Sequence, residues 1–327
     1  MPHFTSSPTI DMPHFTSTPS IKNATIDEIL ELQKTFAEKR LVFVDGERMA
    51  GWLMGLGASA EDLKKIQKVS DKLQGDPTLP FRKSKNGRFL FNFDRNELQR
   101  LEFQEFVLSA AEDFVRHDSE KTRSFEQITT DLQGNTALQA LFLFKSLMIR
   151  SIRTKHRPML DYNHNSYVCT LFNLRTVTTG DLVGEPALEG VHSDGVDFTM
   201  TTFLGAENMT DDSAITFVHD NEEKTAARWH ETNPKLLCGS YQHRHFLDTL
   251  LFVDAEYKHS LTAVEQKDLS RSATRDMLIF FTRKPVVKGH VSYKYDSLVE
   301  HQTLPLRVSL NETLSAGRVG DKRTAAA

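Results

Sequence analysis

The sequence predicts an α+β fold in which a helical first half packs on a second half rich in antiparallel strands. Between about residues 24 and 153, apolar residues recur at the spacing of a helix. Between about residues 165 and 310, this spacing gives way to short strand-like runs, each bounded by Gly, Asp, Asn or Pro. Because helices commonly cover one face of such a sheet, the two halves can form one domain.

Four segments carry the helical pattern. They are residues 25–40, 59–74, 94–117 and 135–153. Thr25 and Glu28, near the start of the first segment, have the T-x-x-E spacing of a capping box. We expect residues 24–155 to form a helical support region.

Six runs carry the strand pattern. They are residues 166–178, 197–205, 214–218, 249–254, 277–283 and 304–310. We therefore expect the β-rich core to span residues 156–310. Residues 1–23 contain the near-duplicate "MPHFTSSPTI" and "MPHFTSTPSI", whose Pro and Ser content favours a disordered extension. Residues 311–327 are expected to form a flexible tail.

Composition and charge narrow the class of protein. The formal net charge of −4 gives no electrostatic reason to expect a nucleic acid or an anionic membrane as partner. No apolar run approaches the roughly 20 residues that span a bilayer. Two cysteines and no secretory signal indicate a reducing, cytoplasmic location. The chain also lacks a Gly-rich phosphate loop and the G-x-S-x-G motif of a serine hydrolase.

One short motif could hold a metal ion. In "EGVHSDGVDF", His192 and Asp194 are two positions apart, and such residues point to the same face of a strand. A third ligand, His259, follows the apolar run that ends at Asp254. Two histidines and one carboxylate are the ligands of the facial triad of non-haem iron oxygenases, which leaves three positions open. The alternative is a turn pair at His192–Asp194 and a structural histidine at 259.

Two arginines could bind an anionic ligand. Arg275 enters the apolar strand 277–283, where an unpaired charge is costly, so it requires an anion. That anion is either Asp254 or Asp276, or the distal carboxylate of a bound 2-oxo acid. Arg175 interrupts the alternating strand 166–178, and either binds a substrate or cosubstrate carboxylate or forms an ion pair.

A second histidine pair, His243 and His245, has the same two-residue spacing as the first motif. No further histidine or cysteine lies at a convincing distance, so metal binding there is the weaker hypothesis.

The order H-x-D, His and Arg on successive short strands resembles the Fe(II)/2-oxoglutarate-dependent dioxygenases, in particular the branch with bacterial free-amino-acid hydroxylases such as L-isoleucine dioxygenase. The similar stretches are "FNLRTV" (172–177), "EPALEGVHSDGVDF" (185–198), "LGAENMTDDSAITF" (204–217), "DTLLFVDAEYKHSLTAV" (248–264) and "TRDMLIFF" (274–281). One departure is "NMTDDS", where this branch tends to have a Gly-Gly pair after the asparagine.

The resemblance implies a double-stranded β-helix, or jelly-roll, core with the N-terminal helices packed on it. It also implies that His192, Asp194 and His259 bind Fe(II) and that Arg275 binds the C5 carboxylate of 2-oxoglutarate. The expected reaction uses O2, converts 2-oxoglutarate to succinate and CO2, and hydroxylates a small substrate. The branch favours a free L-amino acid or a derivative as that substrate.

Two other functions stay open at this point. One is a non-catalytic jelly-roll binding protein, and the other is a cupin-like metalloenzyme that does not use 2-oxoglutarate.

Overall fold

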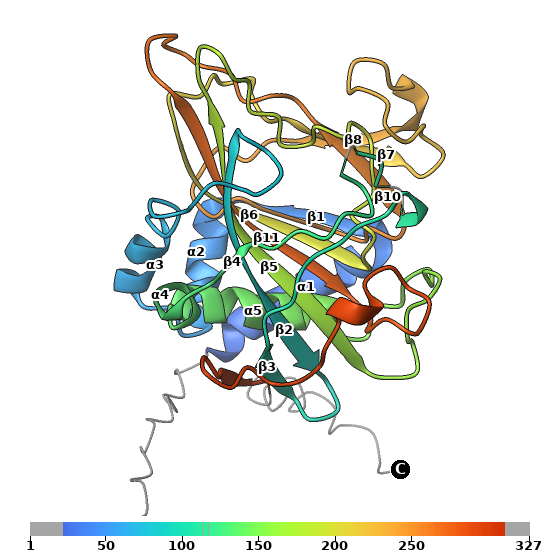
Figure 1. Cartoon of the computed structure of the whole chain (residues 1–327). Helices are drawn as coiled ribbons and strands as arrows, with labels where there is room; N and C mark the ends of the chain where they lie inside the picture. The colour runs from blue at the N-terminus through green and yellow to red at the C-terminus, as the bar shows by residue number, and fades with distance from the viewer. Residues whose placement is uncertain (1–21, 113, 117, 311–327) are drawn as a thin grey trace, which may run out of the picture.

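A large antiparallel sheet with helices on one face forms the centre of the protein, seen in a computed structural model that describes residues 22–112, 114–116 and 118–310 (Figure 1). The α-helices are α1 (Asn23–Lys39), α2 (Gly46–Gly55), α3 (Ala60–Ile66), α4 (Thr130–Gln133) and α5 (Thr136–Ile149), and the short 3-10 helices are η1 (Ala110–Glu112), η2 (Pro234–Leu236) and η3 (Tyr293–Tyr295). The strands are β1 (Leu41–Val44), β2 (Arg82–Asn92), β3 (Glu97–Leu101), β4 (Glu126–Gln127), β5 (Ser166–Thr178), β6 (Phe198–Glu207), β7 (Thr216–Asp220), β8 (Leu237–Tyr241), β9 (Thr249–Phe252), β10 (Tyr257–Leu261), β11 (Ala273–Arg283) and β12 (Arg307–Ser309).

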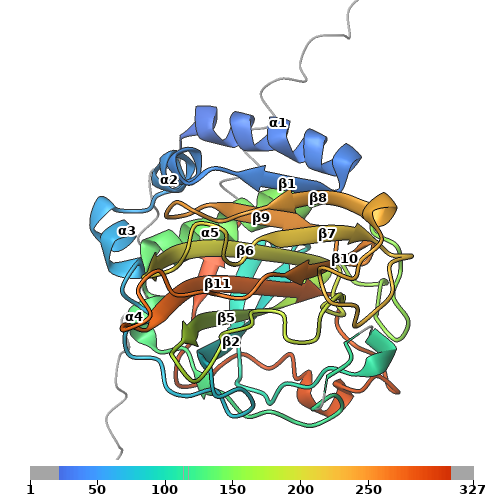
Figure 2. The same cartoon turned by 90° about the horizontal axis from the view of Figure 1, so that it is seen from above.

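Within the described residues the strands form two sheets. The large sheet has the order β1-β9-β6-β11-β5-β2-β3-β12, with β4 paired to β2, and the small sheet has the order β10-β7-β8 (Figure 2). The central strand β11 is antiparallel to both β5 and β6. This arrangement of mainly antiparallel strands with N-terminal helices confirms the predicted α+β, jelly-roll class.

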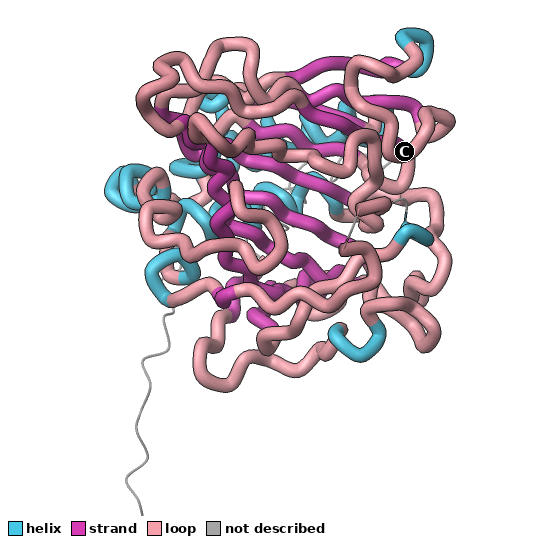
Figure 3. The backbone as a smooth tube through the Cα atoms, turned by 45° about the horizontal axis from the view of Figure 1, so that its top comes forward, coloured by secondary structure: helices cyan, strands magenta, loops and turns pink. Residues whose placement is uncertain are grey.

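The two faces of the large sheet have different partners. On β11, Leu278 and Phe280 belong to the core shared with the helices, whereas Met277, Ile279 and Phe281 line a cavity on the other face. This division follows from the two-residue period of a strand. In Figure 3 the main helices lie behind the strands, and long loops cross in front of them.

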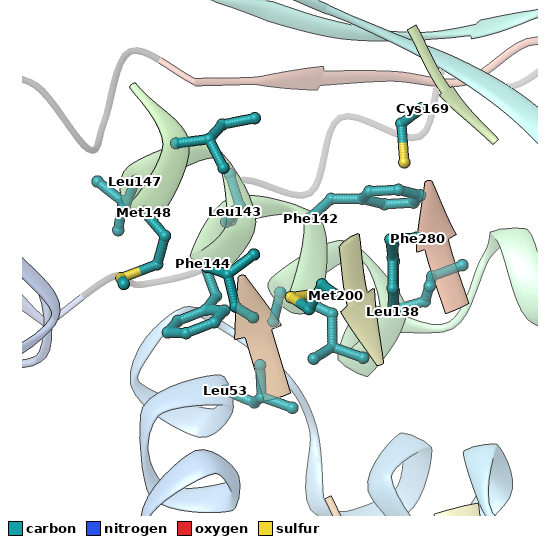
Figure 4. Close-up of a cluster of buried hydrophobic side chains, with 14 of the residues drawn as sticks. Leu53, Leu138, Phe142, Leu143, Phe144, Leu147, Met148, Cys169, Met200 and Phe280 are labelled. Atoms are coloured by element: carbon teal, nitrogen blue, oxygen red, sulfur yellow. The ribbon is translucent and has the colours of Figure 1, made fainter. Parts of the chain in front are cut away.

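Helix α5 is the central element of the helical layer. Asn135 caps it, because the side-chain oxygen accepts hydrogen bonds from the backbone N–H groups of Ala137 and Leu138. Helices α1, α2 and α3 all pack against α5. Figure 4 shows its side chains, including Phe142 and Phe144, meeting sheet residues of this core.

Two of the four predicted helices are confirmed, as α1 and α5, whereas residues 59–74 contain only the shorter α3. The predicted helix 94–117 is wrong. Asn96 adopts a positive φ of 51° in a turn, and β3 then pairs with β2 as a hairpin. The apolar spacing at Leu98 and Leu101 suits a helix, but both side chains are instead buried by the hairpin and its neighbours. Tertiary pairing therefore overrides the local pattern.

The predicted capping box is also wrong. Helix α1 begins at Asn23, so Thr25 lies inside it and packs tightly against Gly55 of α2. Glu28 accepts a hydrogen bond from the Trp52 indole N–H instead of capping the helix.

The predicted strand runs are confirmed as β5, β6, β7, β9, β11 and β12. Strands β1 to β4 come from the region expected to be helical support, and β2 pairs with β5 along eleven residues of each strand. The large sheet therefore draws on both predicted regions. Apart from residues 22 and 23, the predicted N-terminal extension lies outside the described residues, as does the predicted tail.

Among the described residues, no helix combines the length and the apolar character that crossing a membrane requires.

A buried lysine beneath the sheet makes stability depend on pH. Lys145 of α5 is fully buried, donates a hydrogen bond to the Phe280 carbonyl at 2.8 Å, and has a pKa lowered by burial to about 8. Because the unfolded chain holds this proton more tightly, Lys145 makes stability rise with pH between about 8 and 10.5.

We expect Lys145→Met to raise the free energy of unfolding at pH 7 by about 1–3 kcal/mol relative to the wild type, because the variant has no buried charge at this position. The difference should shrink steadily between pH 8 and pH 10, because the folded wild-type amine is neutral in this range while the unfolded chain still holds the proton. Urea unfolding of both proteins from pH 7 to 10 measures it, and a difference that stays constant with pH contradicts the assignment.

Candidate active site

Three of the predicted residues meet at one point. His192 and Asp194 lie on the loop between β5 and β6, and His259 lies in the middle of β10. The backbones of His192 and His259 exchange two hydrogen bonds, of 3.0 and 2.8 Å, so the loop is bound to the small sheet. One ligand atom from each of the three side chains falls within 4.8 Å of the other two, and all three residues are buried.

Two glycines allow the loop to turn on either side of the H-x-D motif. Gly190 and Gly195 have positive φ angles of 78° and 74°. A Cβ at Gly190 would come within 2.5 Å of the Ala227 carbonyl oxygen, so no other residue fits this turn without a shift.

Asp254, at the end of β9, holds the loop in place. Its carboxylate accepts hydrogen bonds from the backbone N–H groups of Asp194 (3.0 Å) and Val196 (3.2 Å) and from the Ser193 hydroxyl (2.8 Å). Arg157 pairs with the same carboxylate at 2.9 Å. Asp254 therefore positions Asp194, and its own negative charge is paired with Arg157.

The orientation of each of these three side chains is fixed by a neighbour. His192 Nδ1 lies 2.9 Å from the Gly190 carbonyl oxygen, so it carries the proton, and Nε2 is left facing Asp194 Oδ1 at 3.4 Å. Thr199 donates a hydrogen bond of 2.6 Å to Asp194 Oδ2. His259 is held by ring contacts with His192 and Phe252, and its Nε2 lies 3.8 Å from Asp194 Oδ2.

The charges around His192, Asp194 and His259 favour a bound cation. Burial opposes protonation of His192, but Glu189, 3.2 Å from Nε2, and Asp194 together raise its pKa to about 9. Burial and the nearby His192 lower the pKa of His259 to about 3, so that imidazole is neutral and able to bind a metal.

The donor set fits a divalent transition metal. Two ligand atoms at right angles, each about 2.1 Å from an ion, lie about 3 Å apart. The separations of 3.4 and 3.8 Å are close to that value, so small side-chain rotations are enough. His192, Asp194 and His259 would hold such an ion from one side of the cavity, which would leave space on the cavity side for further ligands.

The cavity lies between the two sheets and has a volume of about 110 Å³. Its wall is mostly apolar, with His192, Asp194 and His259 on one side. Such a mainly apolar cavity with a few polar groups is typical of a small-molecule site.

Arg275 faces this cavity from β11 and is 4% exposed. The carboxylates suggested as alternatives are used elsewhere, since Asp276 pairs with Arg175 at 2.6 Å and Asp254 pairs with Arg157. Arg275 makes no ion pair with any described residue, and its Nε has no hydrogen-bond partner. Burial lowers its pKa to about 10. The cavity thus contains a buried cation that is not neutralised.

Arg175 lies outside the cavity wall. Its guanidinium makes two hydrogen bonds of 2.6 Å to Asp276 and one of 2.9 Å to Asp71. This is the ion-paired arrangement considered for it above.

Of the second histidine pair, only His243 lines the cavity. His243 lines the cavity and contacts the Thr201 hydroxyl at 3.1 Å, whereas His245 is not part of the cavity wall. Burial and Arg275 lower the pKa of His243 to about 3, so it is neutral. Among the described residues, the grouping of possible metal ligands contains neither histidine.

Several charged residues of the cavity wall carried no signal in the sequence. Glu189, Arg82, Arg116 and Arg123 all line the cavity. The three arginines lie in stretches without a motif, and only the position of Glu189 three residues before His192 could have drawn attention to it.

We expect Arg175→Met to lower the free energy of unfolding by about 2–4 kcal/mol, because Asp276 is left buried without its partner. The same variant should keep the KM for 2-oxoglutarate unchanged, as steady-state kinetics can check. A large rise in KM would instead support a cosubstrate role for Arg175.

A jelly-roll core that brings two histidines and one aspartate to the wall of a buried cavity defines a non-haem metalloenzyme of the oxygenase type. The family model described as 2OG-Fe dioxygenase matches residues 67–281. The chain belongs to this family. The expected cofactors, Fe(II), 2-oxoglutarate and O2, are those of the family, and the prediction of an enzyme of this class is confirmed.

Several known proteins are similar to this chain. The solved structure of the Fe(II)/α-ketoglutarate-dependent dioxygenase TqaL is 48% identical, has a TM-score of 0.76, and covers 88% of this chain and 96% of that one. The bifunctional enzyme flvA of Aspergillus flavus is 48% identical over 282 residues, which are 86% of this chain and 34% of flvA. This chain therefore spans about a third of the length of flvA.

A more distant structure shares the fold alone. A bsmA homologue from Methylobium petroleophilum PM1 is 17% identical, has a TM-score of 0.62, and covers 82% of this chain and 95% of that one.

Proposed function

We propose that this dioxygenase couples the oxidative decarboxylation of 2-oxoglutarate to the hydroxylation of a free L-amino acid or a close derivative. The observation that carries the proposal is the pairing of two features in one cavity. These are the buried cluster of His192, Asp194 and His259 and the buried, unneutralised guanidinium of Arg275.

Each of these residues has a role that follows from its chemistry. His192, Asp194 and His259 hold Fe(II), with Asp254 and Thr199 fixing Asp194. Arg275 binds the C5 carboxylate of 2-oxoglutarate, since a planar guanidinium suits a carboxylate and a buried cation gains most from pairing. The bound iron, with 2-oxoglutarate and O2, supplies the oxidation that yields succinate, CO2 and the hydroxylated product. The protein orients both organic molecules and excludes water.

The choice of substrate rests on the resemblance of residues 172–281 to free-amino-acid hydroxylases and on the size and lining of the cavity. The cavity is small and mostly apolar, which suits a small molecule better than a polymer.

The test begins without oxygen. Wild-type protein given Fe(II) and 2-oxoglutarate is expected to develop the weak visible charge-transfer band of chelated 2-oxoglutarate. Oxygen and a panel of L-amino acids are then added, and succinate is measured. Arg307→Gln, which changes an exposed arginine, serves as the matched control.

Three outcomes separate the candidate functions. Folded protein that binds no Fe(II) and gives neither band nor succinate indicates the non-catalytic jelly-roll protein. Metal binding without consumption of 2-oxoglutarate indicates the cupin-like enzyme. If the band forms but succinate appears only with substrates other than amino acids, the protein is a dioxygenase and the proposed substrate class is rejected.

A further inference from the structure

We propose that Arg123 and Glu189 form the substrate-recognition pair of the cavity, with Arg123 binding the α-carboxylate and Glu189 the α-ammonium group of an amino acid with an apolar side chain. The inference rests on the proposed function and identifies the residues that recognise its substrate. It also gives the cavity two separate anion sites, one at Arg275 for the cosubstrate and one at Arg123 for the substrate.

Arg123 is a buried cation with spare hydrogen-bond donors. It is 4% exposed, lines the cavity, and has no hydrogen-bond partner at Nε or Nη2. Among the described residues, its ion pair is with Asp118, 3.5 Å from Nε, and Asp118 already pairs closely with Arg116. Leaving a buried guanidinium this poorly paired is costly unless a ligand completes it.

The neighbouring arginines are better satisfied. Arg82 donates a hydrogen bond of 2.7 Å to Asp76, and Arg116 binds Asp118 through two nitrogens. Apart from Glu189, to which the proposal assigns the ammonium group, these three guanidinium groups share two carboxylates in this part of the described chain. A further negative charge would therefore be stabilised here, and Arg123 has unused hydrogen-bond donors to bind it.

Arg123 also lies close to the proposed metal ligands. Its guanidinium lies 5.3 Å from the centre of the Phe114 ring, and that ring makes an edge contact with the His192 imidazole at 5.9 Å. One phenyl ring thus separates the cation from a proposed iron ligand. A carboxylate on Arg123 would leave the rest of a small amino acid beside the metal.

Glu189 supplies the opposite charge. Its side chain is 8% exposed, lines the cavity, and contacts His192 Nε2 at 3.2 Å. If that nitrogen held the metal, the buried carboxylate would lose this contact, and an ammonium group could replace it. Arg123 and Glu189 both line the cavity, and the Phe114 ring that contacts Arg123 also contacts the His192 ring that Glu189 approaches.

The remaining wall suits an apolar side chain. The residues that surround these charges are Phe106, Leu108, Phe125, Phe172, Leu174 and Ala187. A charged or strongly polar side chain would lose its hydration there without a partner.

The experiment compares ligands that differ by one charge. L-valine, L-leucine, L-isoleucine, L-methionine and L-phenylalanine are tested with anaerobic protein, Fe(II) and 2-oxoglutarate, with binding followed by calorimetry and turnover by succinate. The best binder is then compared with its amide, which lacks the carboxylate, and with its 2-hydroxy acid, which lacks the ammonium group. Wild-type protein should bind the amino acid at least about 30-fold more tightly than either analogue.

The variants assign each charge to one residue. Arg123→Gln should lose the preference over the amide, and Glu189→Gln should lose the preference over the 2-hydroxy acid, while both keep the 2-oxoglutarate band. Arg307→Gln should behave as wild type. If Arg123→Gln does not fold, Arg123→Lys, which keeps the charge but not the planar fork, should weaken amino-acid binding while the preference over the amide persists.

Other results overturn the inference. Equal binding of the three ligands by wild-type protein rejects the charge pair, and unchanged preferences in the variants reject these two residues. Loss of Fe(II) binding in Glu189→Gln makes Glu189 a metal ligand instead. In each case a normal wild-type band leaves the proposed function standing, whereas absence of that band rejects the proposed function itself.

Discussion

Arg275→Met is expected to stabilise the metal-free protein while it raises the KM for 2-oxoglutarate at least about 30-fold. The two effects have one cause, because the guanidinium is buried at 4% exposure without an anionic partner. In the absence of cosubstrate the charge only costs desolvation energy, so an apolar side chain of similar length should add about 1–3 kcal/mol to the free energy of unfolding. With cosubstrate, the charge-assisted pair is lost.

Chemical unfolding of the metal-free protein and the 2-oxoglutarate dependence of succinate formation measure the two effects. Arg175→Met is the matched control, since its guanidinium is neutralised by Asp276 and its loss should destabilise the protein without affecting 2-oxoglutarate. A destabilised Arg275→Met variant with unchanged KM means that Arg275 is structural.

Asp194→Asn is expected to lower the affinity for divalent metal by at least about 100-fold and to abolish succinate formation. The amide keeps the size of the side chain and can still accept the Thr199 hydrogen bond, so the loop should stay folded. What disappears is the negative charge, which no other member of the three-residue cluster supplies.

Binding of Co(II), followed by calorimetry, measures the loss without any need for turnover. Thermal unfolding adds a second readout, because Co(II) should raise the Tm of the wild type and not that of the variant. Equal Co(II) affinity in both proteins would show that the metal lies elsewhere. Lys145→Met, in the hydrophobic core on the far face of the sheet, should bind Co(II) normally and serves as the control for altered stability.

Strong local patterns allowed part of this fold to be predicted. Strand β5 is rich in β-branched and aromatic residues along its thirteen residues, and α5 is apolar along most of its length, so tertiary contacts only reinforce what these segments favour. The segment 94–117 could not be predicted in this way. Its apolar spacing is compatible with a helix, and only the pairing of β3 with β2 and β12 decides that it begins as a strand.

The residues of the candidate site could likewise be predicted only in part. The H-x-D motif and the later histidine could be singled out as candidate ligands because metal ligation restricts residue type and spacing, and the structure brings the three residues together. Glu189 and Arg123 were not, since a single charged side chain has no pattern until the fold places it in a cavity.

The two strand arginines show what the sequence determined by itself and what required the tertiary structure. Residue types alone determined that an arginine in an apolar strand needs an anion, and this applied equally to Arg175 and Arg275. The register of β5 and β11 decided between them, because it sets Arg175 directly opposite Asp276. Adjacent residues of a strand point to opposite faces, so Arg275, next to Asp276, must face the cavity. A one-residue shift of β11 would instead turn Arg275 to the face of Arg175 and Asp276 to the cavity, and no local feature of the sequence fixes this register.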